Sequence, residues 1–375
     1  MEKKNSRIAI IIGTKAELIK CMPIMLELQK QRREYFFIHT SQHNLGDSCE
    51  EFGVKRPDYV LGIEPAKEIG TKFWAKIKLT TFLWCIKTMF NIRKIVRVIK
   101  PNYVIYHGDT MNTAMAAAGS SSILNPFKKW KNVHLEAGLR SGSLLEPFPE
   151  EITRRIVDRF SDLLFAVSDL SEKKLKKEMS FVRGKIKKTG NTIIDSSLIT
   201  YKKAKKEYKL QEKEYALINL HRYENLKSKK RMRAISEIIK SVKSNAIWPI
   251  HSTTEKYFKE AGLLEEIKNK KNVKIIPLVN YFNFIFLLAN CKYLITDGGS
   301  IQEESLVFKK PCIILRKKTE RQEGLNTGIN FLTGLDVEKT KEIIKKIETD
   351  KIKINNFVNP YGEAGLTKKI VEILK

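Results

Sequence analysis

The sequence has few cysteines and no cysteine pairs. No CxxC motif occurs, and the five cysteines are scattered along the chain: Cys21, Cys49, Cys85, Cys291 and Cys312. This spacing argues against a structural zinc site and is typical of a reduced compartment, so we expect a cytoplasmic protein.

Long apolar runs are also missing. No stretch reaches the roughly 18–20 apolar residues that a membrane-spanning helix needs, so we expect no stable membrane insertion. The N-terminus, MEKKNSRIAIIIGT, is basic and then apolar, but its apolar run is short and it lacks a small-residue cleavage site. We therefore predict a first β-strand there and not a signal peptide.

Acidic residues are outnumbered by basic ones. The 375 residues include 70 Lys and Arg against 42 Asp and Glu, which gives a formal net charge of +28. The lysines recur in helix-like stretches such as EKKLKKE and KEIIKKIE, without an RNA-binding or zinc-finger signature. A lysine-rich surface explains this pattern better than a nucleic-acid partner, which stays open as the alternative.

One stretch mixes apolar and basic residues at helical spacing, FWAKIKLTTFLWCIKTMFNIRKIVRVIK at residues 73–100. It predicts an amphipathic helix that packs on the core or on a second subunit. A helix that lies on a lipid surface is the alternative reading.

Short apolar runs alternate with helical periods from end to end, which predicts an α/β fold with parallel sheets covered on both faces. Runs that are apolar on both faces form two series, broken near KTGNTIID at residues 188–195, and we infer two doubly wound domains. The predicted strands are residues 7–13, 35–40, 103–108, 132–138 and 163–168, then 215–221, 246–251, 273–278, 293–299 and 311–316.

Polar residues follow many of these strands. His39, His107, His221 and His251 each end an apolar run, and His134 lies inside one. Asp109 and Asp297 also come at strand ends. Ligands of such sheets bind outside the carboxyl ends of the strands, so these residues predict a polar cleft between the two domains.

Two strand-to-helix turns are candidate phosphate sites, although neither GxGxxG nor GxxxxGK[ST] occurs. In IIGTKAELIK, Lys15 lies in the turn and Lys20 about one helical turn later, facing either a phosphate or solvent. In TDGGSIQEES, the residues 298–300 (Gly-Gly-Ser) leave backbone N–H groups for an anion, and Arg321 in TERQEG adds a forked donor.

Carboxylates gather in EAGLRSGSLLEPFPEEITRRIVDR, residues 136–159, within this basic chain. Glu136 ends a predicted strand, Glu150 and Glu151 precede a helix, and Asp109 ends another strand. Acids crowded in a partly desolvated cleft raise one another's pKa values, as proton transfer near neutral pH requires.

The chain resembles the UDP-N-acetylglucosamine 2-epimerases. Ten motifs occur in the order seen in that family: GTKAELIK, HGDT, HLEAGLRSG, PFPEEITRRI, TGNTIID, HRYEN, TDGGSIQEE, KPCIILR, TERQEG and NPYGEAG. The resemblance implies two Rossmann-like domains that face a cleft, the glycosyltransferase GT-B-like arrangement. The implied domains are residues 1–188, with a C-terminal helix of residues 364–375 packing back on them, and a UDP-binding domain of residues 189–363.

The resemblance also implies the reaction. A base removes the C2 proton of the sugar while UDP leaves C1, and the resulting 2-acetamidoglucal is protonated on its opposite face before UDP re-adds. No cofactor and no metal are expected, the substrate partner is a UDP-sugar, and homodimers are usual. Surface polysaccharide biosynthesis is the implied setting.

Site residues follow from the same resemblance, motif by motif. Asp109, Glu136 and Glu150 resemble the catalytic carboxylates, and His221 the histidine near the phosphates and the reacting centre. The resemblance implies that the diphosphate is bound by Lys15, Gly298, Gly299, Ser300 and Arg321. It implies that Glu304 binds the ribose and that Phe284 lies near the uracil. Lys20 and Arg140 are expected to line the sugar side of the site.

Several motifs depart from the family pattern. Lys15 and Ala16 replace an arginine and a proline, TDGGS replaces TDSGG, HRYEN replaces HRREN, and only His251 remains of an HPNP-type stretch. The activator stretch QHxxM retains only Gln42 and His43, which argues against activation by a second substrate molecule.

Three other functions stay open. A hydrolysing epimerase would release ManNAc and UDP, but HGDT without a GDR-type replacement favours the non-hydrolysing type. A glycosyltransferase on the same fold is disfavoured by the acid cluster and HRYEN, and a non-enzymatic basic binding protein would leave those acids without a task.

Overall fold

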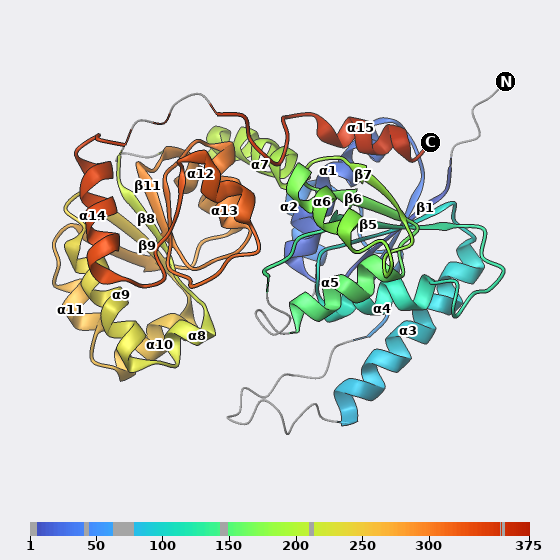
Figure 1. Cartoon of the computed structure of the whole chain (residues 1–375), viewed down its shortest axis with the longest axis horizontal. Helices are drawn as coiled ribbons and strands as arrows, with labels where there is room; N and C mark the ends of the chain where they lie inside the picture. The colour runs from blue at the N-terminus through green and yellow to red at the C-terminus, as the bar shows by residue number, and fades with distance from the viewer. Residues whose placement is uncertain are drawn as a thin grey trace. The chain divides into compact units, whose positions relative to one another are not determined.

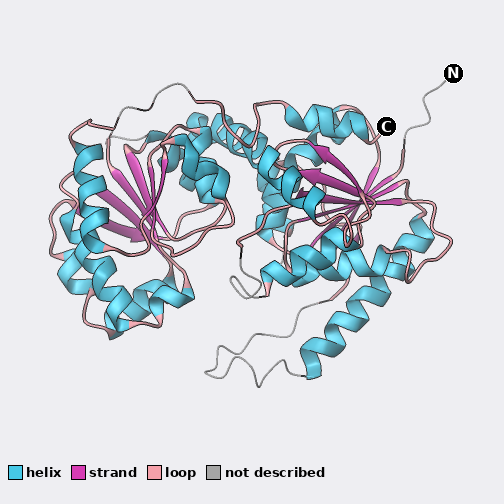
Figure 2. Cartoon of the chain, viewed as in Figure 1, coloured by secondary structure: helices cyan, strands magenta, loops and turns pink. Residues whose placement is uncertain are grey.

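The computed structural model describes residues 6–40, 45–62, 79–142, 149–209, 214–352, 354 and 357–375. The chain divides into two compact units, Met1–Ser196 with Tyr361–Lys375 (unit 1) and Ser197–Pro360 (unit 2). The division falls within a helix that follows the predicted domain boundary at residue 188. Each unit is a parallel sheet with helices packed on it (Figures 1 and 2).

Among the described residues, the sheet of unit 1 has seven strands in the order β3-β2-β1-β4-β5-β6-β7, all paired in parallel. The strands are β1 (Ile8–Ile12), β2 (Tyr35–His39), β3 (Tyr59–Val60), β4 (Tyr103–His107), β5 (Lys131–Ala137), β6 (Leu163–Ala166) and β7 (Lys185–Lys188). The helices are α1 (Lys15–Lys30), α2 (Gly46–Phe52), α3 (Leu79–Ile99), α4 (Met111–Ser120), α5 (Glu150–Arg159), α6 (Asp169–Lys177), α7 (Ile193–Glu207), which runs into unit 2, and α15 (Leu366–Ile373).

The described sheet of unit 2 has six parallel strands in the order β10-β9-β8-β11-β12-β13. The strands are β8 (Ala216–Asn219), β9 (Ala246–Ile250), β10 (Val273–Pro277), β11 (Tyr293–Thr296), β12 (Cys312–Ile314) and β13 (Asn330–Leu332). The helices are α8 (Tyr223–Leu226), α9 (Lys229–Ser241), α10 (Ser252–Glu260), α11 (Leu264–Lys268), α12 (Tyr281–Asn290), α13 (Ile301–Val307), a 3-10 helix (Gln322–Thr327) and α14 (Val337–Glu348).

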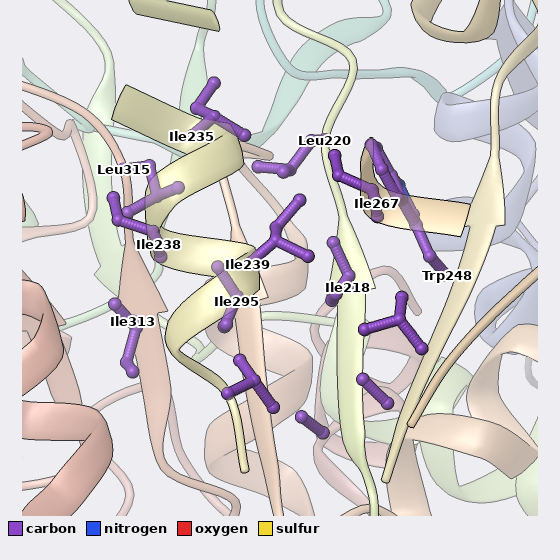
Figure 3. Packing of buried hydrophobic residues seen from close by; sticks show 14 of the residues in the cluster. Ile218, Leu220, Ile235, Ile238, Ile239, Trp248, Ile267, Ile295, Ile313 and Leu315 are labelled. Carbon is purple, nitrogen blue, oxygen red and sulfur yellow. The ribbon is translucent and has the colours of Figure 1, made fainter. Parts of the chain in front are cut away.

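Alternate residues of the strands in unit 2 enter two different hydrophobic cores. Ile218 and Ile295 belong to the core on one face, together with residues of α9 such as Ile239 (Figure 3). Leu217 and Leu294 belong to the core on the other face, with residues of α12. Because both faces are apolar and covered, the strands read as continuous hydrophobic runs, as expected for a buried parallel sheet.

The predicted α/β fold with two doubly wound sheets is confirmed, and all ten predicted strands form. Sequence reasoning missed β3, β7 and β13, each of which lies at an edge of its sheet. Edge strands are short and often carry lysine, which protects them from pairing with other chains. The sequence of β7, KIKK, shows this property and therefore lacks the apolar signal of the central strands.

The C-terminal helix α15 belongs to unit 1. The guanidinium of Arg33 donates a hydrogen bond of 2.9 Å to the carbonyl of Leu374. The carboxylate of Asp195 accepts hydrogen bonds from the amides of Gly365 (2.6 Å) and Thr367 (2.8 Å), at the start of the helix. These contacts fix both ends of α15 on the N-terminal unit.

The amphipathic stretch at residues 73–100 contains α3, although residues 73–78 lie outside the described part of the chain. Ile92 and Val96 of α3 are wholly buried in the core of unit 1, whereas Leu83 and Val98 are exposed. The prediction that this helix packs on the core is therefore confirmed for its buried face. None of the described helices is long and apolar enough to cross a membrane.

Candidate active site

Four of the predicted site residues follow the strands at which the order of each sheet reverses. In unit 1, Lys15 follows β1 and Asp109 follows β4, the two strands between which the order reverses. In unit 2, His221 follows β8 and Gly298 follows β11, which form the corresponding pair. Such reversals leave a crevice at the carboxyl edge of a parallel sheet, the usual ligand position.

Glu17 ties the two turns of the unit 1 reversal together. Thr14 caps α1 and forms a capping box with Glu17, whose carboxylate accepts hydrogen bonds from the amides of Gly13 (2.5 Å) and Thr14 (3.2 Å). The hydroxyl of Thr110, which caps α4, donates to the same carboxylate at 2.5 Å. Burial raises the pKa of Glu17, although these hydrogen bonds act in the opposite direction.

The backbone at Gly13 has no room for a side chain. A Cβ atom there would lie 2.5 Å from both Cβ and Cγ of Asn112. Gly13→Ala is therefore expected to lower the free energy of unfolding by about 1–3 kcal/mol, measured by urea denaturation. In Gly13→Ala/Asn112→Gly all the clashing atoms of residue 112 are removed, so the double variant should lose less stability than the two single variants added together. Additive losses would contradict the clash.

Lys15 and Lys20 occupy different environments on α1. The side chain of Lys15 is 42% exposed and its Nζ lies 3.7 Å from Oε2 of Glu51. Lys20 is buried, and its ammonium group forms an ion pair with Glu136. The two lysines therefore differ in solvent access, and the ammonium group of Lys20 is paired with Glu136.

Glu136 is held in an unusual backbone conformation at the end of β5. Its φ is +68°, in the left-handed region that non-glycine residues rarely adopt, and the register of β5 with β6 shifts at this point. Besides Lys20, its Oε2 lies 3.1 Å from Nε2 of His107 and 3.5 Å from Nδ2 of Asn191. A bulge of this kind re-aims one side chain, and such strain is concentrated at functional sites.

His107 makes stability depend on pH. Burial lowers its pKa, and Lys20 and His134 add to this effect, whereas the charge of Glu136 opposes it. The folded chain therefore disfavours a proton that the unfolded chain binds below about pH 6.5. The stabilisation is present above that pH and is lost as the pH falls, by up to about 1.4 kcal/mol per pH unit.

His107→Gln should remove this contribution, because glutamine does not titrate. Urea unfolding measured from pH 5 to pH 8 should show a smaller loss of stability below about pH 6.5 in the variant than in the parent chain. An equal loss in both proteins would show that His107 does not carry the effect.

Asp109 lies beside a buried histidine network at the end of β4. Its carboxylate forms an ion pair with Arg154 of α5. The carbonyl of Gly108, the preceding residue, lies 2.9 Å from Nε2 of His134, whose Nδ1 lies 2.7 Å from Asp158. The network fixes the turn that carries Asp109, which itself stays partly exposed with 24% of its side chain accessible.

Arg140, expected to line the sugar side, is engaged within unit 1. Its Nη2 donates to Asp158 (2.6 Å) and to Glu178 (2.8 Å), and the residue is buried. Burial alone would raise the pKa of Asp158, but Arg140 and His134 hold it below its usual value. The guanidinium thus anchors α5 and α6 to the loop after β5.

Glu150 and Glu151 begin α5, where negative charge complements the helix dipole. Glu151 is wholly buried, accepts a hydrogen bond of 3.1 Å from the amide of Ser141, and pairs with Arg154 at 3.2 Å. Glu150 is half-buried. The loop that precedes them, with Glu146, lies outside the described residues, as do Gln42 and His43.

Asp297 organises the opposite turn in unit 2. It is wholly buried, and its carboxylate accepts hydrogen bonds from the amides of His221 (3.0 Å) and Arg222 (3.1 Å) and from Nδ2 of Asn225 (2.9 Å). The side chain of His221 is 42% exposed, and its ring centroid lies 5.0 Å from that of His251. Asp297 therefore holds the HRYEN turn in the position that presents His221.

The turn between β11 and α13 is built from close backbone contacts. The amide of Gly298 donates to Oγ1 of Thr296 at 2.9 Å, and Nε2 of Gln302 donates to the carbonyl of Gly298 at 2.7 Å. Gly299 and Ser300 are half-buried. A Cβ atom on Gly299 would lie 3.3 Å from Nη1 of Arg321. The guanidinium therefore lies directly beside the turn.

Arginines and glutamates form a buried charge cluster next to this turn. Glu320 bridges Arg316 and Arg321, with its Oε2 2.9 Å from Nη2 of Arg316 and its Oε1 paired with Nη1 of Arg321. Nε of Arg321 also lies 3.1 Å from Oε2 of Glu303. Burial lowers the pKa of Arg316, with Arg222 and Arg321 acting in the same direction and Glu320 against it.

Glu304 and Phe284, predicted for ribose and uracil, come from adjacent helices of unit 2. Glu304 is buried, and its Oε1 accepts a hydrogen bond of 2.8 Å from the hydroxyl of Tyr281. Burial raises the pKa of Tyr281, and the charge of Glu304 adds to this. Phe284 is partly buried against the core that α12 covers. The site therefore offers an acceptor and an aromatic surface on neighbouring elements.

Sequence reasoning missed several residues that fix this geometry. The sequence places His107 and Asp297 at strand ends without a specific role, and it assigns no role to Asn191 and Arg316. Each of the four is buried beside a predicted site residue. Their signal in the sequence is a polar side chain just after an apolar run, which also fits a purely structural role.

The two sheets, each with polar residues at its strand-order reversal, define a protein of two Rossmann-like units. The lipopolysaccharide outer core galactosyltransferase in its apo form shares this fold, with a TM-score of 0.57 at 12% identity, over 98% of each chain. The sequence model of the UDP-N-acetylglucosamine 2-epimerase family matches residues 26–375, and the chain belongs to this family. The predicted resemblance is thereby confirmed.

Similar proteins cover nearly the whole chain. The UDP-N-acetylglucosamine 2-epimerase of Methanocaldococcus jannaschii is 35% identical over 387 residues, with 98% of each chain covered. The crystal structure of the UDP-GlcNAc 2-epimerase from that organism, in complex with UDP-GlcNAc and UDP, has a TM-score of 0.79 at 34% identity. The match covers 98% of this chain and 99% of the chain in that crystal structure.

Proposed function

We propose that this chain is a non-hydrolysing epimerase that interconverts UDP-GlcNAc and UDP-ManNAc. The observation that carries the proposal is Glu136, a buried carboxylate on a strained bulge in contact with Lys20 and His107. Membership of the family and the UDP-GlcNAc bound by the relative from Methanocaldococcus jannaschii support the choice of substrate.

The proposed chemistry is an elimination followed by an addition. A carboxylate takes the C2 proton, the electron pair forms the C1–C2 double bond, and the C1–oxygen bond breaks to release UDP. A second group then protonates the opposite face of C2 while a UDP oxygen re-adds at C1, so that atoms and electrons balance. The reaction therefore needs at least two groups that exchange protons.

Asp109 and Glu136 suit these two tasks. Asp109 follows β4, and Glu136 lies at the end of β5. Because these two strands pair directly, both carboxylates lie at one edge of the sheet of unit 1. Arg154 is the positive partner of Asp109, and Lys20 is the positive partner of Glu136. Carboxylates are common general bases, so either residue is a candidate for the proton acceptor. Glu150 is a third candidate.

The UDP leaving group is assigned to unit 2. Arg321 lies beside the half-buried turn at Gly299 and Ser300, where a guanidinium and backbone N–H groups suit phosphate oxygens. Glu304 and Phe284 are assigned to the ribose and the uracil. His221 is presented by the turn that Asp297 holds, as a donor near the bond that breaks.

The hydrolysing reaction is the second candidate, because it shares the elimination step and differs only in the fate of the intermediate. HGDT at residues 107–110 favours re-addition of UDP, through the resemblance to non-hydrolysing members.

To separate the two reactions, the chain is incubated with UDP-GlcNAc and the products are separated by anion-exchange chromatography. We expect UDP-ManNAc in equilibrium with UDP-GlcNAc. Free ManNAc with stoichiometric UDP would establish hydrolysis, and an unchanged substrate would oppose both reactions.

A further inference from the structure

A buried arginine beside the β11–α13 turn has no role in the reaction as described above. Arg316 lies two residues after the end of β12. There Ile314 pairs with Thr296 of β11, and the amide of Leu315 donates to the carbonyl of Thr296 at 2.8 Å. Arg316 therefore lies level with Gly298, at the start of the turn. Only 7% of the residue is exposed.

The guanidinium of Arg316 is only partly satisfied. Its Nη2 is bound to Glu320, whereas Nε and Nη1 are buried and have no hydrogen-bond partner among the described residues. Buried donors without a partner cost about 1–3 kcal/mol each, and more for charged groups. Native structures retain such groups rarely, and often where function requires them.

Glu320 connects this arginine to the turn. A Cβ atom on Gly299 would lie 3.3 Å from Oε1 of Glu320 and 3.3 Å from Nη1 of Arg321. Oε2 of the same carboxylate binds Arg316. The chain of contacts therefore runs from Arg316 through Glu320 to Arg321 and ends beside the backbone of the turn.

We propose that Arg316 is a positioning residue for the diphosphate site: it fixes Glu320, and through it the guanidinium of Arg321 beside Gly299. This inference rests on the proposed assignment of the diphosphate to this turn. Arg316 also balances the charge of Glu320, which would otherwise repel the phosphates from within the cluster. Its role is therefore specific for the charged part of the ligand and does not extend to the uridine.

The test compares two ligands that differ in the diphosphate. The Kd for UDP is measured by calorimetry, and binding of uridine by ligand-observed NMR, which suits weak binding. Arg316→Gln is expected to raise the Kd for UDP by about 10-fold to 100-fold and to change uridine binding less than twofold. Lys317→Gln, which removes an exposed positive charge from the next residue, is the matched control and should change neither.

A double-mutant cycle separates positioning from direct contact. In a Glu320→Gln background, Arg316→Gln should add less than about twofold to the Kd for UDP, because its partner is already altered. Equal effects in both backgrounds would overturn the proposal, as would an unchanged Kd for UDP or equal losses of affinity for UDP and for uridine.

If Arg316→Gln does not fold, Arg316→Lys is tested in its place. Lysine retains the charge without the forked guanidinium and should raise the Kd for UDP about threefold. A Kd equal to that of the parent chain would also overturn it. A parent chain that binds no UDP would instead refute the proposed function.

Discussion

Glu136→Gln is expected to lower the rate of proton exchange at C2 of UDP-GlcNAc by about 10²-fold to 10⁴-fold, the usual contribution of a general acid or base. The amide keeps the size of the carboxylate but cannot accept the C2 proton. It also loses the charge that pairs with Lys20, so some loss of stability is expected as well. The exchange rate is followed by proton NMR in heavy water.

Two controls make the Glu136 result specific. Glu34→Gln alters an exposed acid in the same unit and should leave the exchange rate unchanged. UDP affinity of Glu136→Gln should stay within about threefold of the parent, because UDP is assigned to unit 2. An exchange rate within a factor of a few of the parent would remove Glu136 from the proton-transfer step.

Asp297→Asn is expected to lower the stability of unit 2 by about 2–4 kcal/mol and to abolish epimerisation. The carboxylate is wholly buried and accepts three hydrogen bonds, two of them from the amides of His221 and Arg222. An asparagine offers one acceptor oxygen and directs an NH₂ group at donors, so buried N–H groups lose their partner.

The measurement for Asp297→Asn is urea unfolding followed by tryptophan fluorescence, because Trp248 is wholly buried in the core of unit 2. The midpoint of its transition should fall. Asp350→Asn removes an exposed carboxylate of the same unit and should leave the midpoint unchanged. An unchanged midpoint in Asp297→Asn would show that the His221 turn is held by other contacts.

The central strands, and the polar residues at their ends, could be predicted from the sequence because their signals are local. Continuous apolar runs such as IAIII specify buried parallel strands, and polar residues that follow them fall at one edge of the sheet. The edge strands were missed for the opposite reason. The KIKK sequence of β7 is solvated by its lysines and gives no apolar run.

The fine geometry of the site depends on tertiary contacts that no local pattern contains. The bulge at Glu136 follows from a register shift between two strands, and the partners of its carboxylate are far away in sequence, at Lys20, His107 and Asn191. Arg140 shows the same limit. Its guanidinium binds Asp158 and Glu178, which lie 18 and 38 residues further along the chain.

The direct test of the proposed mechanism is incubation of the intact chain with UDP-GlcNAc in heavy water, followed by proton NMR of the sugar. Elimination and re-addition require the C2 proton to be replaced from solvent. We therefore predict that deuterium appears at C2 of both UDP-GlcNAc and UDP-ManNAc as epimerisation proceeds. UDP-ManNAc that forms with the original proton still on C2 would contradict the mechanism.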